Sequence, residues 1–253
     1  MSVFVNTRPT DDDGFTKLGM PSVHLPLLTI TPFDTLSEQE NAHLTRFIKG
    51  EIGMVVVVSV QAVRCAVAFL KKQGIHHAHD LPHRPTMIAV GEPTKHALAQ
   101  FGFDVITPNE QGLPMSNEGM IQLPILANLG KDDTVMIWRG VGGRRLLSDT
   151  LSERGVNVVA IAFYQRSAPL DLGERFDDFY QALPSHTPLF VLISSGTSLD
   201  GWRHFDRHTH PTTFLALGDR LTALTRQHYP DNTVICVDDL HPNTLLTALN
   251  QTS

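Results

Sequence analysis

The stretch that decides the fold is TVMIWRGVGGRRLLSDTLSERGVNVVAIAFYQRSAP, residues Thr134–Pro169. It opens with an apolar run and then breaks at a glycine-rich turn around Gly140. Leu146, Leu147 and Leu151 follow at helical spacing, and Gly155 stands where a helix ends. A second apolar run leads to Tyr164. This order predicts a strand, a helix and a parallel strand, with backbone N–H groups at the turn placed for an anionic ligand.

The rest of the chain continues this alternation. Met54 to Val58 is a continuous β-branched run, typical of a strand buried on both faces, and Ser59 closes it. We predict one further strand at Val23–Ile30 and a helix at Glu38–Lys49. Pro124 predicts a kink or a late start in the helix that follows Ser116.

Composition excludes several classes of protein. The chain has 253 residues, 42% of them hydrophobic, which is enough for a substantial core. A net charge of −6 with scattered Lys and Arg argues against nucleic-acid binding. The distant Cys65 and Cys236 give neither a disulfide framework nor a zinc motif, and the histidines lack ligand spacing, so no metal is expected. Because no signal peptide or membrane-spanning run is evident, we expect a cytoplasmic protein with no membrane partner.

An internal repeat is hidden in the order of the elements. The series MVVVVS, MIAVG, DVITP is echoed by LFVLISS, TFLALG, TVICVD, each strand followed by a helix. Each copy also has a strand that ends in an arginine, Arg139 for the first and Arg8 for the second. The fold class predicted is therefore α/β, with two similar parallel-sheet lobes of flavodoxin or Rossmann type and a ligand cleft between them.

The lobe boundaries follow from this split repeat. Lobe 1 is expected to comprise residues 1–31 and 168–253, and lobe 2 residues 34–162. Residues 28–33 and 162–168 would form a two-stranded linker that acts as a hinge.

The order of short motifs along the whole chain resembles the uroporphyrinogen-III synthase family. The motifs are TRP after the first strand, LPLL, strand-Ser followed by QAV, VGEPT, strand-RG-helix, RGVNV…FYQR, strand-SS, and a C-terminal LG turn with PNTLL. This resemblance implies a cyclising hydro-lyase of tetrapyrrole and haem biosynthesis that needs no cofactor. Its substrate would be the linear tetrapyrrole hydroxymethylbilane, closed with loss of water and inversion of ring D. A monomer in transient contact with the enzyme that forms hydroxymethylbilane is expected.

The resemblance also assigns candidate site residues. Tyr164 matches the family's tyrosine at the lobe crossing and is the candidate proton donor to the departing hydroxyl. The other candidates would bind the substrate's carboxylates through hydroxyls, turn amides or guanidinium groups: Arg8, Ser59, Thr94, Arg139, Gly140, Ser194, Ser195, Gly196 and Thr222.

Each assignment has a plainer alternative. Tyr164 can simply pack in the linker, the Ser and Thr residues can cap helices, and the arginines can form ion pairs. The turn at Gly140, Gly142 and Gly143 lacks the full GxGxxG pattern, so a dinucleotide site is rejected.

Two departures from the family pattern stand in the terminal lobe. Leu221 occupies the position where the family has a threonine, with Thr222 one place later, and little room for a first helix exists between residues 11 and 20. These features keep open the alternative of a catalytically degenerate two-lobed binding or regulatory module. A small-molecule enzyme of flavodoxin-like or nucleotide-binding type would fit the fold alone, but the match along the whole chain argues against it.

Overall fold

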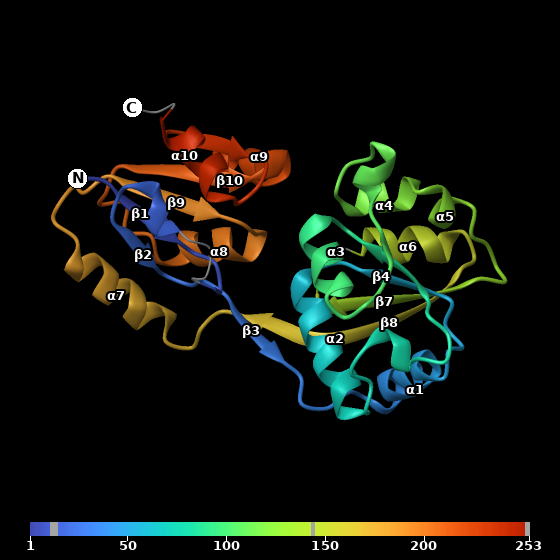
Figure 1. Ribbon diagram of the computed structural model, residues 1–253. Helices are drawn as coiled ribbons and strands as arrows, with labels where there is room; N and C mark the ends of the chain where they lie inside the picture. The colour runs from blue at the N-terminus through green and yellow to red at the C-terminus, as the bar shows by residue number, and fades with distance from the viewer. Residues whose placement is uncertain (11–14, 143–144, 251–253) are drawn as a thin grey trace. The chain divides into compact units, whose positions relative to one another are not determined.

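The computed structural model describes residues 1–10, 15–142 and 145–250, and the chain divides into two compact units. Unit 1 comprises Met1–Ile30 and Ser167–Ser253, and unit 2 comprises Thr31–Arg166. The chain enters unit 2 along β3 (Thr29–Pro32) and leaves it at the end of β8 (Asn157–Ser167), and the two strands are neighbours in one sheet (Figure 1).

Unit 2 contains a six-stranded sheet in the order β3-β8-β7-β4-β5-β6, in which β8 to β6 pair in parallel. The remaining strands are β4 (Met54–Val57), β5 (Thr86–Ala89), β6 (Val105–Ile106) and β7 (Thr134–Gly140). The helices are α1 (Glu38–Ile48), α2 (Val60–Lys72), α3 (Glu92–Ala99), α4 (Asn117–Gln122), α5 (Pro124–Ala127) and α6 (Leu146–Glu153), with 3-10 turns at Ala78–Asp80 and Pro108–Gln111.

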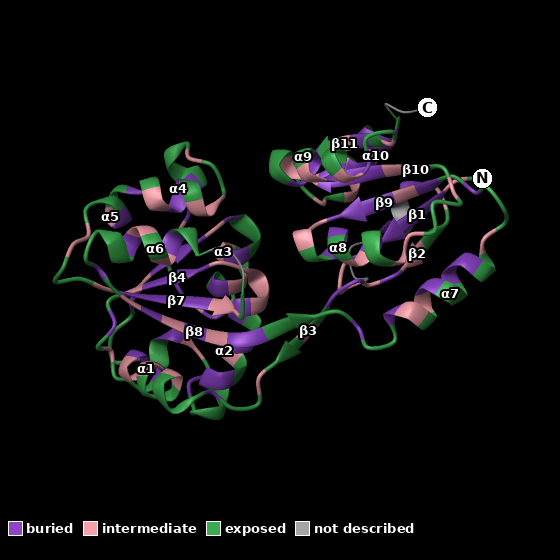
Figure 2. Cartoon of the chain, turned by 180° about the vertical axis from the view of Figure 1, so that it is seen from behind, coloured by how far each residue is buried: buried purple, intermediate pink, exposed green. Residues whose placement is uncertain are grey.

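Both faces of this sheet are covered, which explains its continuous apolar runs. Val56 and Ile137 pack with Leu147 and Leu151 of α6 in one hydrophobic cluster. On strand β7, Trp138 packs edge-on against Phe47 of α1 and Phe163 of β8. Figure 2 shows the central strands buried along most of their length.

Unit 1 contains a five-stranded sheet in the order β11-β10-β9-β1-β2, and all its pairs are parallel. Its strands are β1 (Val3–Asn6), β2 (Ser22–His24), β9 (Leu189–Ile193), β10 (Thr212–Leu217) and β11 (Thr233–Val237). Its helices are α7 (Leu172–Ala182), α8 (Gly196–Phe205), α9 (Gly218–His228) and α10 (Pro242–Asn250), with a 3-10 turn at Phe15–Leu18.

Trp202 and Phe176 pack into one cluster of this unit, and Phe4 and Leu245 into another. The prediction of an α/β fold with two parallel sheets is thus confirmed.

Two local predictions can be compared with the structure. The single strand expected at Val23–Ile30 is wrong: β2 ends at His24 and β3 begins at Thr29. The N–H groups of Leu25 and Leu27 donate to the carbonyls of Asn6 and Thr7, so the intervening chain stays bound to β1 although it forms no strand there. The effect expected of Pro124 is confirmed, because α4 ends at Gln122 and a new short helix begins at Pro124.

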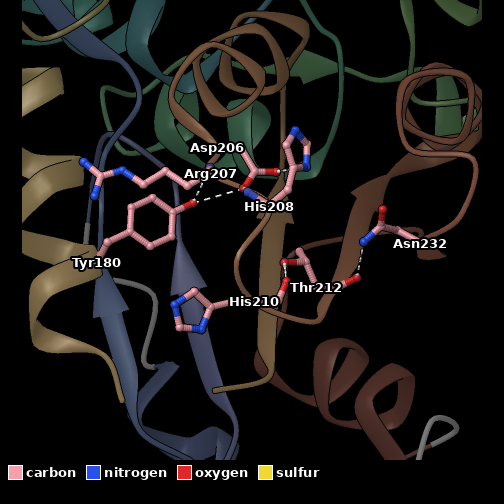
Figure 3. A network of polar contacts seen from close by, with 7 residues as sticks. All are labelled: Tyr180, Asp206, Arg207, His208, His210, Thr212 and Asn232. Carbon is pink, nitrogen blue, oxygen red and sulfur yellow. Dashed lines mark hydrogen bonds and ion pairs between the residues drawn. The ribbon is translucent and has the colours of Figure 1, made fainter. Parts of the chain in front are cut away.

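A cluster of polar contacts around the buried Asp206 side chain holds the loop between α8 and β10 in unit 1 (Figure 3). The carboxylate of Asp206, whose side chain is 6% exposed, accepts hydrogen bonds from the Tyr180 hydroxyl at 3.1 Å and from the His208 N–H at 3.0 Å. The Arg207 N–H donates to the same Tyr180 oxygen, and the His210 ring stacks on Tyr180. The cluster lies next to the first residue of β10, Thr212, and fixes the entry to that strand.

Candidate functional site

The order of the strands marks one edge of the unit 2 sheet as a site. The chain proceeds from β4 to β5 and β6 on one side, then returns to β7 and β8 on the other, so its direction reverses between β4 and β7. In open parallel sheets, ligands bind outside the carboxyl ends of the strands at such a reversal. A pocket of about 310 Å³ opens at this point. Its walls are Val58, Val90, Met115, Ser116, Asn117, Ile137, Arg139, Gly140, Val141, Gly142, Leu147, Ser148, Tyr164 and Arg166, all within unit 2.

Tyr164 is the buried hydroxyl of this pocket. It lies on β8 and is 1% exposed. Its phenol oxygen is 3.0 Å from the hydroxyl oxygen of Ser59 and accepts a hydrogen bond from a terminal nitrogen of Arg166, also at 3.0 Å. The guanidinium carbon of Arg166 lies 5.5 Å from the centre of the Tyr164 ring, within the range of a cation–π contact. The Tyr164 hydroxyl therefore has two protein partners in addition to its place on the pocket wall.

Ser59 caps a helix, which is the plainer alternative given for it, and it also contacts Tyr164. It is the N-cap of α2, where its hydroxyl oxygen accepts the N–H of Ala62 at 3.1 Å. The same oxygen contacts the Tyr164 phenol. Capping the helix and holding the phenol thus depend on one side chain at the carboxyl end of β4.

Gly140 is required by the close approach of Tyr164. The ladder between β7 and β8 shifts register here, because Arg139 pairs with Ala162 and Gly140 with Tyr164, which leaves Phe163 as an extra residue. A Cβ at Gly140 would lie 2.5 Å from ring carbons of Tyr164. The next residues, Val141 and Gly142, line the pocket, whereas Gly143 of the predicted turn lies outside the described residues.

Arg139 supplies a cationic group at the carboxyl end of β7 and lines the pocket. Its Nε atom is buried, with no hydrogen-bond partner among the residues described. It acts electrostatically on Glu40 of α1. The electrostatic effect on Glu40 supports the plainer alternative, in which Arg139 interacts with a charge of the protein itself, although Arg139 also lines the pocket.

Glu40 ties α1 to the strand that carries Tyr164. One carboxylate oxygen accepts the N–H of Ala162 at 2.9 Å, and the other accepts the N–H and the hydroxyl of Ser37. Burial opposes ionisation of Glu40, but these hydrogen bonds and the positive charge of Arg139 outweigh it and hold its pKa below the usual value. The charged form of Glu40 therefore stabilises the strand two residues before Tyr164.

The candidates of unit 1 occupy the corresponding edge of their own sheet. Its strand order reverses between β1 and β9, and Arg8 follows β1 while Ser194, Ser195 and Gly196 follow β9. Ser195 is the N-cap of α8 and forms a reciprocal pair with Ser198. The backbone of Arg8 is fixed, because its N–H donates to the Asn6 side chain and its carbonyl contacts the ring of His24. These residues thus share the topological position of Ser59 and Arg139 in unit 2.

Thr94 and Thr222 are buried and are not among the residues that line the unit 2 pocket. Thr94 lies in the first turn of α3, and Thr222 lies in α9 with its hydroxyl donating to the carbonyl of Gly218 at 3.0 Å. Leu221 is 4% exposed and belongs to the unit 1 core. The substitution of leucine at this family position therefore contributes to packing, and burial favours a structural role for both threonines.

Sequence reasoning did not identify Arg166 or the polar residues Ser116, Asn117 and Ser148 of the pocket wall. A signal for Arg166 did exist, since residues two apart on a strand project to the same face, which pairs Arg166 with Tyr164. The other three come from α6 and the segment that begins α4, and only the tertiary fold brings them to the pocket.

Two other kinds of site can be tested against the structure. Within the described ranges, no group of three or more His, Cys, Asp or Glu side chains is arranged to hold a metal ion. In the same part of the chain, no helix combines the length and apolar character needed to cross a membrane.

Comparison with known proteins gives a consistent result. Residues 12–235 match the family model described as uroporphyrinogen-III synthase HemD. The chain is 35% identical over 153 residues to uroporphyrinogen-III synthase of Salmonella typhimurium strain LT2, an alignment that covers 59% of this chain and 56% of that protein. It is 32% identical over 175 residues to the Escherichia coli K12 uroporphyrinogen-III synthase, covering 66% of each. The aligned part of the chain thus spans between about half and two thirds of these curated relatives.

Two solved structures share the fold over nearly the whole chain. Uroporphyrinogen-III synthetase from Helicobacter pylori 26695 is 14% identical with a TM-score of 0.64, and covers 99% of this chain and 100% of its own. A mutant uroporphyrinogen III synthase from the extremely thermophilic bacterium Thermus thermophilus is 12% identical with a TM-score of 0.61 and the same coverage. With a family model matched over most of its length, the chain belongs to the uroporphyrinogen-III synthase HemD family.

Proposed function

We propose that the protein is an active uroporphyrinogen-III synthase, a cyclising hydro-lyase that converts hydroxymethylbilane into uroporphyrinogen III. Membership of the family and the names of the two bacterial relatives support the activity. The observation that carries it to specific residues is the Tyr164 phenol, held between Ser59 and Arg166 in the wall of the unit 2 pocket.

The proposed chemistry requires little of the protein. The pyrrole nitrogen of ring A pushes out the hydroxyl of the hydroxymethyl group, and Tyr164 protonates that hydroxyl as it leaves. The substituted carbon of ring D then attacks, giving a spiro intermediate that fragments and closes again with ring D inverted. The protein has to fold the bilane, supply one proton and prevent direct closure to the uninverted isomer.

Carboxylate binding is assigned to both sheet edges. In unit 2 the proposed groups are Arg139 and the turn at Gly140 in the pocket wall and Ser59 at the start of α2, and in unit 1 they are Arg8 and Ser194 to Gly196. Backbone amides at turns and helix starts bind anions without a dense cationic patch, which reconciles an anionic substrate with a net charge of −6. At about 310 Å³, the unit 2 pocket suits one substituted pyrrole ring rather than the whole substrate.

Several finer assignments belong to this proposal. The two units are taken as the lobes of the enzyme, with residues 28–33 and 162–168 as the linker between them. Thr94 and Thr222 remain predicted substrate contacts, although both side chains are buried, which counts against this prediction. We further propose a cytoplasmic monomer that receives hydroxymethylbilane from the enzyme that forms it.

The test is incubation of the purified protein with freshly made hydroxymethylbilane, followed by oxidation and separation of the product isomers. The type III isomer in excess over the spontaneous type I product is the expected result. Type I alone, from protein shown to be folded by circular dichroism, would exclude synthase activity. It would favour the alternative of a binding or regulatory module. Two features of unit 1 motivate that alternative: leucine stands at position 221, and a 3-10 turn, Phe15–Leu18, is the helical element described between β1 and β2.

A further inference from the structure

We propose that Arg166 is a positioning residue that directs the proton of Tyr164 into the pocket and stabilises the phenolate left when that proton departs. The proposal rests on the synthase function given above, and it deepens the role of Tyr164. It concerns a residue that the sequence motifs alone do not assign to the site.

The direction of the Arg166 hydrogen bond is unambiguous. A guanidinium group carries only donors, so the Tyr164 oxygen must be the acceptor of the 3.0 Å contact. The contact is charge-assisted, and it grows stronger as negative charge develops on the phenol oxygen. Arg166 therefore stabilises negative charge that develops on the phenol oxygen during the reaction, and it occupies one of the two acceptor positions of that oxygen.

The hydroxyl groups of Tyr164 and Ser59 carry two protons, and the hydrogen bond between them uses only one. Ser59 already accepts the Ala62 N–H, and its oxygen shares a single hydrogen with Tyr164 across 3.0 Å. If Ser59 donates, the phenol oxygen accepts twice and its own proton is directed elsewhere. If Tyr164 donates, the Ser59 proton is the one left over. In the first arrangement the available proton is that of Tyr164, which lines the pocket, and its departure leaves the charge on the oxygen that Arg166 contacts.

The proton and electron balance of the step follows from this arrangement. The bond between the methylene carbon and the hydroxyl oxygen of ring A breaks, and its electron pair leaves on the oxygen. That oxygen takes the proton from the Tyr164–Ser59 pair and departs as water. The pyrrole nitrogen supplies the compensating electrons, and the phenolate remains beside Arg166. The ring D carbon that forms the final bond loses its hydrogen, which returns the proton to the phenolate.

The backbone places Arg166 for this role. It lies two residues beyond Tyr164 on β8, so both side chains project to one face of the strand. Arg166 is exposed while Tyr164 is buried, and both line the pocket. A competing role, binding of a substrate carboxylate, would use the same guanidinium and must be separated by experiment.

The first measurement is a spectrum that does not require turnover. The chain has three tyrosines, so protein labelled with ¹³C at tyrosine Cζ gives three resonances, and the one lost in Tyr164→Phe is that of Tyr164. We expect Arg166→Gln to move this resonance and leave those of Tyr180 and Tyr229 in place. Arg84→Gln, at an exposed arginine of unit 2, is the matched control and should move none of them. An unmoved Tyr164 resonance in Arg166→Gln would overturn the proposal.

The second measurement is kinetic, on the full chain with hydroxymethylbilane. Loss of a hydrogen bond that is stronger in the transition state than in the ground state lowers kcat and leaves KM nearly unchanged. We expect Arg166→Gln to lower kcat about ten- to a hundredfold, and Arg166→Lys to restore part of it, because lysine keeps the charge without the planar fork. In a Tyr164→Phe background the same substitution should have less than about a twofold further effect, since it acts through the phenol.

The remaining outcomes are distinct. Arg166→Gln could instead raise KM and leave kcat unchanged, or it could lower kcat in the Tyr164→Phe background as much as in the wild type. Either result would identify Arg166 as a carboxylate-binding residue and overturn the positioning role. A moved resonance with unchanged kcat would also overturn it. A folded wild-type protein that forms no type III isomer would refute both the synthase function and the catalytic part of this proposal, while the resonance would still decide whether Arg166 holds Tyr164.

Discussion

Gly140 and Tyr164 lie face to face across the β7–β8 ladder, so closely that a single methyl group does not fit between them. A Cβ at Gly140 would be 2.5 Å from the Cε2 and Cζ atoms of the Tyr164 ring, and Tyr164 is 1% exposed. Glycine is therefore dictated here by the tyrosine rather than by an unusual backbone angle.

Gly140→Ala should displace Tyr164. Overpacking of this kind costs about 1–3 kcal/mol of unfolding free energy, and the shifted phenol should lose its contacts to Ser59 and Arg166. We expect a lower denaturant midpoint together with a fall in type III isomer formation. Gly53→Ala is the control, because nothing lies within 4 Å of a Cβ at that glycine. Equal behaviour of the two variants would show that Tyr164 does not need this close approach.

Tyr164→Phe should separate chemistry from folding. The ring keeps its packing, and Ser59 keeps its bond to the Ala62 N–H, so we expect unfolding free energy to change by less than about 1.5 kcal/mol. A general acid contributes about 10²–10⁴ in rate, and kcat should fall accordingly. Tyr180→Phe, which removes a hydroxyl from the polar cluster of unit 1, should instead lower stability and spare kcat. Full activity of Tyr164→Phe would remove the phenol from the mechanism.

Glu40 predicts a dependence of stability on acidic pH. Its pKa is held below the usual value in the folded protein, so the folded state favours the charged form more than the unfolded state does. Its stabilising contribution is complete above the unfolded pKa of about 4.3 and is lost as the pH falls through the lower folded value. Glu40→Gln should cost about 1 kcal/mol at pH 7 and flatten the fall in melting temperature below about pH 4.5. An unchanged pH profile in this variant would contradict the assignment.

Tyr180 and Tyr229 predict a loss of stability in alkali. Burial, together with the negative charge of Asp206, raises the pKa of both phenols well above the ordinary value of 10. The folded protein then holds protons that the unfolded chain has released, so stability is complete below about pH 10 and falls by up to about 1.4 kcal/mol per pH unit for each tyrosine above it. Denaturant unfolding between pH 8 and pH 11 should show this slope, and Tyr180→Phe should reduce it. The same slope in wild type and variant would rule out Tyr180 as a cause.

The site was partly predictable from sequence. Tyr164 at the end of an apolar run and Ser59 after the Met54 to Val58 run both stood at strand ends, where a parallel sheet binds ligands. The structure adds that these two hydroxyls touch, although 105 residues separate them. It also shows that the Thr222 hydroxyl is used by the backbone and that Leu221 fills a core. Spacing along the chain distinguishes a strand end from a strand middle, but not an exposed hydroxyl from one bonded to a carbonyl.

The sequence by itself determined the alternation of strands and helices, because apolar periodicity and the Gly and Pro breaks are local properties of the chain. It also determined where the polar turns lie relative to the strands. Only the tertiary structure decided the register shift at Arg139 and Gly140, the contact of Tyr164 with Ser59, and the burial of Asp206 among residues of α7 and the α8–β10 loop. These contacts join residues that are distant in the chain, and their free energy depends on packing and burial that no local pattern encodes.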